Sequence, residues 1–204
     1  MRKLVLQMQT SLDLFVCDET GSTEGFIWNW EPDWKWDIRL QREFIGLIQS
    51  VDCVLLSRKM ADEGFIDYWH SIAAQDANPA STFARDIDLA EKVVFSRTRK
   101  KSSWPNATLA SSDFVQTIVE LKESKGKTII AYGGVEFASE LITSGLIDEL
   151  VFYTNPIAFG RGKSIFENSK TKMRFQLLSA TSYECGVVIL KYKPTDHSEH
   201  REEE

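Results

Sequence analysis

Short apolar runs recur along the chain and alternate with amphipathic stretches. The runs cover residues 3–9, 53–56, 92–95, 128–132 and 149–154. After Asp37, Asp113 and Gly134, apolar residues recur at three- and four-residue spacing, the period of a helix with one buried face. Continuous apolar runs are typical of strands buried on both faces of a parallel sheet. The pattern therefore predicts an α/β fold of three layers, with a mainly parallel central sheet between helices.

The last third of the chain has a different pattern. Residues 175–184 and 187–192 form two extended segments joined around Cys185 and Gly186, with no helical period between them. They predict an antiparallel hairpin that closes the sheet. We expect one domain over residues 1–193 and a charged, disordered tail over residues 194–204.

A long segment without regular pattern lies between the first run and the first helix. It covers residues 10–36 and holds four tryptophans, Trp28, Trp30, Trp34 and Trp36. A loop of this length inside a compact domain is usually functional. The indole rings suit a pocket for a flat substrate, with Trp36 as the candidate contact, and they equally suit a dimer face.

The composition excludes several classes of function. With 24 basic and 30 acidic residues, the net charge of −6 leaves no concentrated basic surface for a nucleic acid. Three scattered cysteines and three histidines, of which His197 and His200 lie in the tail, offer little for a metal site or a catalytic triad. No apolar run approaches the roughly 20 residues that span a bilayer, and no signal peptide is visible, so we expect a cytoplasmic protein.

Three of the predicted strands end in hydroxyl, cationic or glycine residues. In open α/β sheets, ligands bind beyond the carboxyl ends of the strands. A glycine pair before a helix lets an anion approach backbone N–H groups, and arginines suit the 2′-phosphate that distinguishes NADPH from NADH. Each feature alone is also explained by a tight turn or a solvated side chain. Together they predict a nucleotide site at Ser57, Arg58, Lys59, Ser96, Arg97, Tyr132, Gly133, Gly134, Val135 and Glu136.

Several segments resemble the dihydrofolate-reductase-like proteins. They are residues 6–13, 54–59, 93–98 and 133–149, and the most specific stretch is residues 133–163. Among these proteins, the chain is most similar to the C-terminal reductase domain of the bifunctional riboflavin-biosynthesis deaminase/reductase and its stand-alone relatives. The resemblance extends from about Met1 to Tyr192, without the zinc-binding deaminase half.

The resemblance implies a dihydrofolate-reductase-like fold and NADPH-dependent reduction of a planar heterocycle. The substrate would be of pterin type or like 5-amino-6-(5-phosphoribosylamino)uracil. The resemblance also implies a homodimer, the cofactor pyrophosphate at Gly133, Gly134 and Val135, and the 2′-phosphate near Arg58, Ser96 and Arg97.

The chain departs from its apparent relatives at three places. Leu14 follows Asp13 where relatives have glycine, and Ser57 also replaces a glycine. Residues 160–166, which include Arg161 and Lys163, differ from the Gly-Ser-Gly-Lys-Pro-Leu-Phe sequence that relatives have at this turn. Arg161 and Lys163 are candidates for holding a substrate phosphate, and an exposed basic turn explains them equally well.

Reduction of a C=N or C=O bond also needs a proton donor. The candidates are Asp13 and Asp37, with Thr154 orienting a ring substituent. Asp13 also fits a turn-stabilising role and Asp37 a helix N-cap. The alternatives to a reductase are a non-catalytic nucleotide-binding or sensor protein on the same fold, and a purely structural dimer module.

Overall fold

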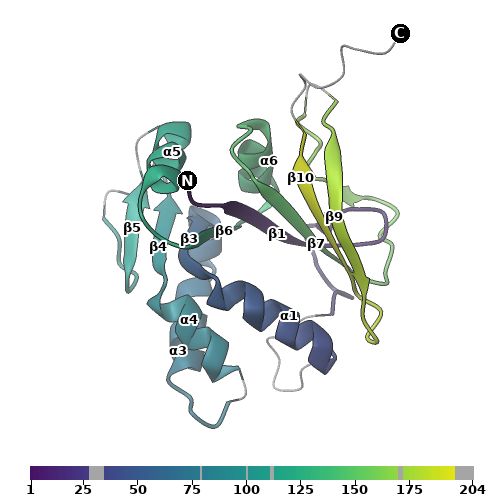
Figure 1. Cartoon of the computed structure of the whole chain (residues 1–204), viewed down its shortest axis with the longest axis horizontal. Coiled ribbons are helices and arrows are strands. Elements are labelled where there is room, and N and C mark those ends of the chain that lie inside the picture. The colour runs from purple at the N-terminus through teal and green to yellow at the C-terminus, as the bar shows by residue number, and fades with distance from the viewer. Residues whose placement is uncertain (28–34, 79, 100, 111–112, 170–171, 196–204) are drawn as a thin grey trace.

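The computed structural model describes residues 1–27, 35–78, 80–99, 101–110, 113–169 and 172–195. In this part of the chain, the main sheet has eight strands in the order β5-β4-β3-β6-β1-β7-β10-β9 (Figure 1). The strands are β1 (Leu4–Thr10), β3 (Val51–Ser57), β4 (Glu91–Phe95), β5 (Ala107–Ala110), β6 (Thr128–Tyr132), β7 (Glu149–Thr154), β9 (Phe175–Ser182) and β10 (Val188–Pro194). All pairings from β5 to β7 are parallel, whereas β10 is antiparallel to both β7 and β9. The predicted mainly parallel sheet with a C-terminal antiparallel hairpin is confirmed.

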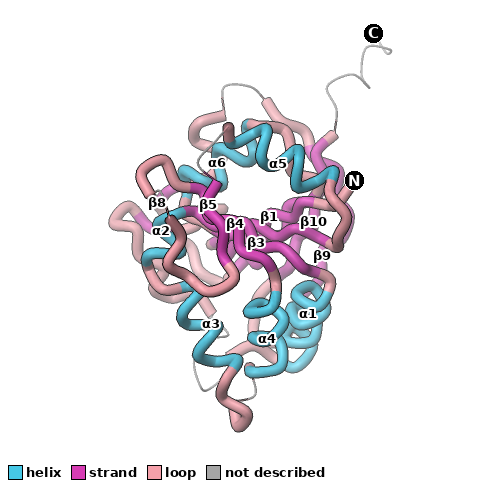
Figure 2. Tube along the Cα trace, turned by 90° about the vertical axis from the view of Figure 1, so that its left-hand side faces the viewer, coloured by secondary structure: helices cyan, strands magenta, loops and turns pink. Residues whose placement is uncertain are grey.

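Helices cover both faces of the sheet, as Figure 2 shows. They are α1 (Ile38–Gln49), α2 (Arg58–Asp62), α3 (Phe65–Ala73), α4 (Ser81–Leu89), α5 (Phe114–Glu123) and α6 (Val135–Thr143). One core, which includes Leu40, Trp69 and Phe83, lies between the sheet and α1, α3 and α4. The other includes Ile118 and Leu141 and lies under α5 and α6. The three-layer arrangement therefore follows from strands that are apolar on both faces.

Local sequence signals explain where the helices begin and end. The Asp37 carboxylate accepts hydrogen bonds from the N–H groups of Arg39 and Leu40 and caps α1. Asp113 caps α5 in the same way, through the Gln116 N–H. Gly145 follows α6 with a φ of 70°, the left-handed conformation that glycine adopts at little cost.

Two elements have no clear signal in the sequence. The edge strand β5 is a short, half-exposed Ala-Thr-Leu-Ala segment, and it pairs only with β4 in the described sheet. Within the segment of residues 10–36, β2 (Cys17–Asp18) pairs with β8 (Gly162–Lys163) and fixes the two distant loops to each other. Both elements depend on tertiary pairing rather than on a local apolar pattern. Trp28, Trp30 and Trp34 lie outside the described residues, as does most of the predicted tail.

The strand register brings the ends of five parallel strands to one edge of the sheet. Thr10 lies opposite Thr154, Ser57 opposite Phe95, and Leu56 opposite Tyr132. The candidate residues at the strand ends therefore share the carboxyl edge. Among the described helices, none is both long and apolar enough to cross a membrane.

Candidate functional site

The N-terminus of α6 is open at Gly134. Gly134 is the N-cap, and it provides no side-chain hydrogen bond to the first turn. A Cβ at this position would meet no heavy atom within 4 Å, and Gly134 is exposed, so a group from solvent can approach the backbone here. The first N–H groups of a helix lack intrahelical partners and carry a partial positive charge. The cradle therefore fits an anionic group such as a diphosphate.

Gly133 has a different role from Gly134. A Cβ at Gly133 would lie 2.4 Å from Cδ1 of Phe137, so the close approach of that ring requires glycine here. Packing accounts for Gly133, and only Gly134 faces open space. Val135 packs partly against the core, and Glu136 is exposed in the first turn of α6.

Tyr132 precedes the glycines at the end of β6. Its ring packs against Phe65, with 5.4 Å between the ring centroids. The phenolic oxygen is buried and has no hydrogen-bond partner in the described structure, and burial raises the pKa of Tyr132. A buried hydroxyl without a hydrogen-bond partner is uncommon in folded proteins, and Tyr132 places one at the carboxyl edge of the sheet.

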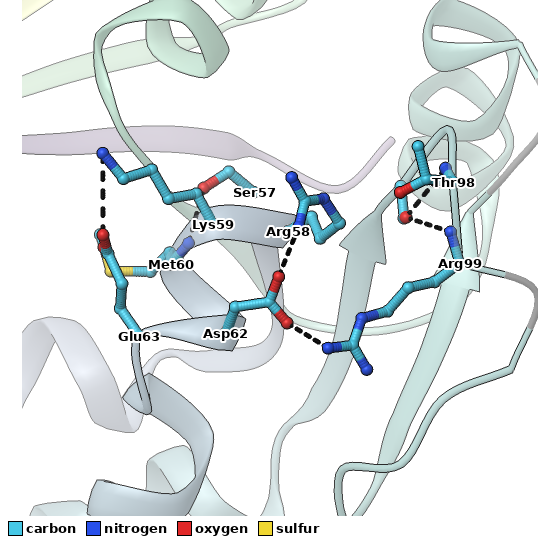
Figure 3. A network of polar contacts seen from close by, with 9 residues as sticks. Ser57, Arg58, Lys59, Met60, Asp62, Glu63, Thr98 and Arg99 are labelled. Carbon is cyan, nitrogen blue, oxygen red and sulfur yellow. Dashed lines mark hydrogen bonds and ion pairs between the residues drawn. The ribbon is translucent and has the colours of Figure 1, made fainter.

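Two arginines from separate parts of the chain meet at Asp62 (Figure 3). The Asp62 carboxylate accepts hydrogen bonds from Arg58 of α2 and from Arg99, both at 2.6 Å. Ser57 caps α2 by accepting from the Met60 N–H at 3.1 Å, and Lys59 lies 3.7 Å from Glu63. Asp62 and Arg99 are not among the residues that the sequence predicts for this site. The four-residue spacing of Arg58 and Asp62 was an available signal, but the contact with Arg99 is tertiary.

The loop after β4 is fixed by the buried side chain of Ser96. Its hydroxyl oxygen accepts from the N–H groups of Arg99 at 2.9 Å and Thr98 at 3.3 Å. Arg97 points outward with its side chain 90% exposed, and its guanidinium lies 3.6 Å from Glu140 of α6. The loop therefore presents Arg99 toward α2 and Arg97 toward α6. The structure thus brings together the predicted cofactor residues of all three strand ends.

Asp37 and Asp13, the two candidate proton donors, both accept backbone hydrogen bonds. Burial raises the pKa of Asp37, but the N–H groups of Leu40, Cys185 and Arg39 outweigh this effect and the pKa falls below its ordinary value. Asp13 accepts from the Ser11 hydroxyl, which lowers its pKa most, and from the Gly160 N–H at 2.7 Å. Asp13 thus anchors the end of β1 to the turn at Gly160. Both environments favour the ionised carboxylate, so the turn-anchoring interpretation accounts for Asp13 better than proton donation.

Thr154 is buried at the end of β7. Its hydroxyl lies 3.2 Å from that of Thr10 on β1. The next residue, Asn155, is not predicted from the sequence as a site residue and is completely buried. Its amide nitrogen donates to Gln9 at 2.7 Å, and its oxygen accepts from the Ile27 N–H at 2.8 Å. Asn155 therefore connects the segment of residues 10–36, at Ile27, to the carboxyl edge of the sheet.

The three candidate substrate contacts lie in different environments. Trp36 is 3% exposed, stacks on Tyr153 with centroids 5.4 Å apart, and donates to the Ile27 carbonyl. The structure therefore places Trp36 in the core, and a contact of its ring with substrate stays a prediction. Arg161 and Lys163 are exposed beside or within β8, and a Cβ at Gly21 would lie 3.7 Å from the Lys163 Nζ. Both cations therefore lie on the turn that the β2–β8 pairing fixes.

The sheet order, the C-terminal hairpin and the shared carboxyl edge define a dihydrofolate-reductase-like fold. The family model of the RibD C-terminal domain matches residues 2–189. The chain therefore belongs to the RibD C-terminal domain family, in agreement with the resemblance noted in the sequence.

Comparison with individual proteins supports the same fold. The protein YyaP of Bacillus subtilis strain 168 is 24% identical over 193 residues, which are 94% of each chain. The deaminase/5-amino-6-(5-phosphoribosylamino)uracil reductase of Thermotoga maritima superposes with a TM-score of 0.63 at 15% identity, over 95% of this chain and 57% of that one. Dihydrofolate reductase from Enterococcus faecalis, solved in complex with NADP(H), superposes with a TM-score of 0.54 at 12% identity, over 95% and 97% of the two chains.

Proposed function

We propose that this protein is an NADPH-dependent reductase of a planar heterocycle, either pterin-like or like 5-amino-6-(5-phosphoribosylamino)uracil. The observation that carries the proposal is the open N-terminus of α6 at Gly134, at the same edge of the sheet as the arginines that follow β3 and β4. Backbone N–H groups at this helix would hold the pyrophosphate, and Arg58, Arg97 and Arg99 would hold the 2′-phosphate. The family membership and the NADP(H) complex of the similar dihydrofolate reductase support this assignment.

When bound, NADPH would supply a hydride from its nicotinamide ring. In this proposal Asp37 is the group that moves a proton to the product, directly or through water, because it stands half-buried at the start of α1. Thr154 and Thr10 would orient a polar ring substituent, and Arg161 with Lys163 would attract a substrate phosphate.

One observation favours the second candidate, a non-catalytic nucleotide-binding or sensor protein. The carboxylates of Asp13 and Asp37 both have lowered pKa values and accept backbone hydrogen bonds, which suits structural acceptors more than proton donors. A protein of this kind would bind the nucleotide at Gly134 and show no turnover with pterins or aminopyrimidines.

The binding claim is tested by charge reversal at the two strand ends. We expect Arg58→Glu and Arg97→Glu to weaken NADPH much more than NADH, measured by calorimetry. Lys125→Glu is the matched control, because Lys125 is exposed in the α5–β6 loop, at the opposite edge of the sheet. Equal losses for both cofactors would disprove the 2′-phosphate assignment.

We also propose a homodimer that forms through the C-terminal hairpin. Leu177 and Leu178 on the edge strand β9 are 51% and 46% exposed, and an exposed apolar edge strand commonly pairs with another chain. We expect a dimer in size-exclusion chromatography with light scattering, and a monomer after Leu177→Lys with Leu178→Glu.

A further inference from the structure

Asp62 lies between Arg58 and Arg99, at the position where the proposed cofactor would place its 2′-phosphate (Figure 3). One carboxylate oxygen accepts from Arg58 and the other from Arg99, so both oxygens are engaged. We infer that Asp62 determines cofactor specificity: it competes with the 2′-phosphate for these guanidinium groups and narrows the preference for NADPH over NADH. The inference rests on the proposed function, because it concerns the same cofactor site.

The competition follows from the charges in the cluster. Two guanidinium groups and one carboxylate leave a net charge of +1, whereas a phosphate monoester carries about −1.5 to −2 near neutral pH. A phosphate that contacts both guanidinium groups would lie within a few ångströms of the Asp62 carboxylate. Juxtaposed like charges are strongly unfavourable in a partly desolvated site, and the Asp62 side chain is only 24% exposed. A 2′-phosphate that uses the same N–H groups therefore has to displace Asp62, and one that uses the other N–H groups of these guanidinium groups binds against its repulsion.

If Asp62 only held Arg99 in position, neutralising Asp62 would weaken binding of the 2′-phosphate. The surroundings of Arg99 argue against this role. Its guanidinium lies 4.7 Å from the centre of the Trp104 ring, a cation–π contact, and its backbone N–H donates to the Ser96 hydroxyl. Two contacts that do not involve Asp62 thus hold Arg99 in place. Neutralising Asp62 would keep Arg99 near the site and remove the repulsion.

The same carboxylate does not disfavour a cofactor without the phosphate. A ribose 2′-hydroxyl can donate to a carboxylate, which is the way that many NAD sites select their cofactor. Asp62 therefore weakens NADPH selectively, and NADH keeps its affinity.

The test uses two nucleotides that differ in the 2′-phosphate, adenosine 2′,5′-bisphosphate and 5′-AMP, measured by titration calorimetry on the full chain. We expect Asp62→Asn to bind adenosine 2′,5′-bisphosphate about tenfold more tightly, with 5′-AMP unchanged within about twofold. Glu63→Gln is the matched control, because it removes one negative charge from the same helix end while Glu63 pairs with Lys59 and not with the arginines. Adding Arg99→Met to Asp62→Asn should abolish the gain.

Several outcomes would overturn the inference. They are unchanged or weaker binding of adenosine 2′,5′-bisphosphate to an Asp62→Asn protein with an intact thermal unfolding transition, an equal gain in Glu63→Gln, or no binding of this nucleotide to any variant. Failure of the proposed function takes one of two forms. Either no variant binds adenosine 2′,5′-bisphosphate, which overturns the proposed cofactor site and the inference together, or the nucleotide pattern appears as described but no pterin or aminopyrimidine is reduced when NADPH is supplied.

Discussion

The Asp37 carboxylate links the start of α1 to the turn between β9 and β10. Its Oδ1 accepts from the Arg39 and Leu40 N–H groups, and its Oδ2 accepts from the Cys185 N–H at 3.3 Å. Arg39 also lies over the Tyr183 ring at 5.6 Å, so the same helix end contacts the turn twice. Asp37 is thus a cap, a tertiary contact and the proposed proton donor, and these roles can be separated by mutation.

Replacing Asp37 by alanine removes the acceptor for three N–H groups. We expect a loss of about 1–2 kcal/mol in unfolding free energy, whereas Asp37→Asn, which retains a capping oxygen, should lose less. Because the folded pKa of Asp37 lies below its ordinary value, the charged form contributes stability above the unfolded pKa, near 3.8. That contribution is lost as the pH falls through the folded pKa. Urea unfolding at pH 7 and at about pH 3 checks both expectations.

The proposed role of Asp37 as proton donor is tested by measuring turnover. Turnover that drops sharply in a stably folded Asp37→Asn protein supports it, and unchanged turnover would leave Asp37 as a cap.

Leu14 has a φ of 63°, in the left-handed region, with its side chain 47% exposed. An L-residue with a Cβ pays roughly 1–2 kcal/mol for this conformation, and an exposed leucine recovers little of it by packing. We expect Leu14→Gly to raise the unfolding free energy by about 1 kcal/mol, or Tm by about 2–4 °C. Leu14→Ala keeps the Cβ and should bring no such gain. A lower Tm in Leu14→Gly would show that the leucine side chain stabilises the loop. New NADPH oxidation in Leu14→Gly would instead indicate an enzyme impaired by the leucine.

The two glycines before α6 should respond differently to added side chains. Gly133→Ala places a Cβ 2.4 Å from Phe137 and should cost about 1–3 kcal/mol of stability. Gly134→Asp should stabilise the helix as an N-cap while placing a carboxylate in the proposed pyrophosphate cradle. We expect this variant to melt at or above the wild-type Tm and to lose NADPH binding at least tenfold. Retained binding would contradict the cradle.

Tyr132 carries a buried hydroxyl without a partner in the described structure. Removing such a group avoids its desolvation cost, so Tyr132→Phe should be neutral or stabilising by up to about 1 kcal/mol in the free protein. A marked loss of stability in thermal unfolding would show that the hydroxyl has a hydrogen-bond partner in solution.

The sequence predicts the parts of the fold that have strong local signals. Apolar runs locate β1, β3, β4, β6 and β7, and Asp37 and Gly145 mark helix ends. The edge strand β5 has no such run, since its residues are half-exposed and its pairing with β4 defines it.

The candidate site is predictable at the level of strand ends but not of side-chain partners. The parallel topology brings Ser57, Ser96 and Tyr132 to one edge, as inferred. The contact of Arg99 with Asp62 joins residues 37 positions apart, and the burial of Trp36 against Tyr153 depends on how α1 packs. Neither contact follows from local sequence, because tertiary packing determines both.

The most direct test is thermal unfolding of the purified protein with NADPH, with NADH and without cofactor. A ligand at one hundred times its dissociation constant contributes about 2.7 kcal/mol, a shift of roughly 5–10 °C for a domain of this size. At equal concentrations we expect NADPH to raise Tm more than NADH, and the difference to widen in Asp62→Asn. No rise in Tm with either cofactor, at millimolar concentration, would contradict the proposed function.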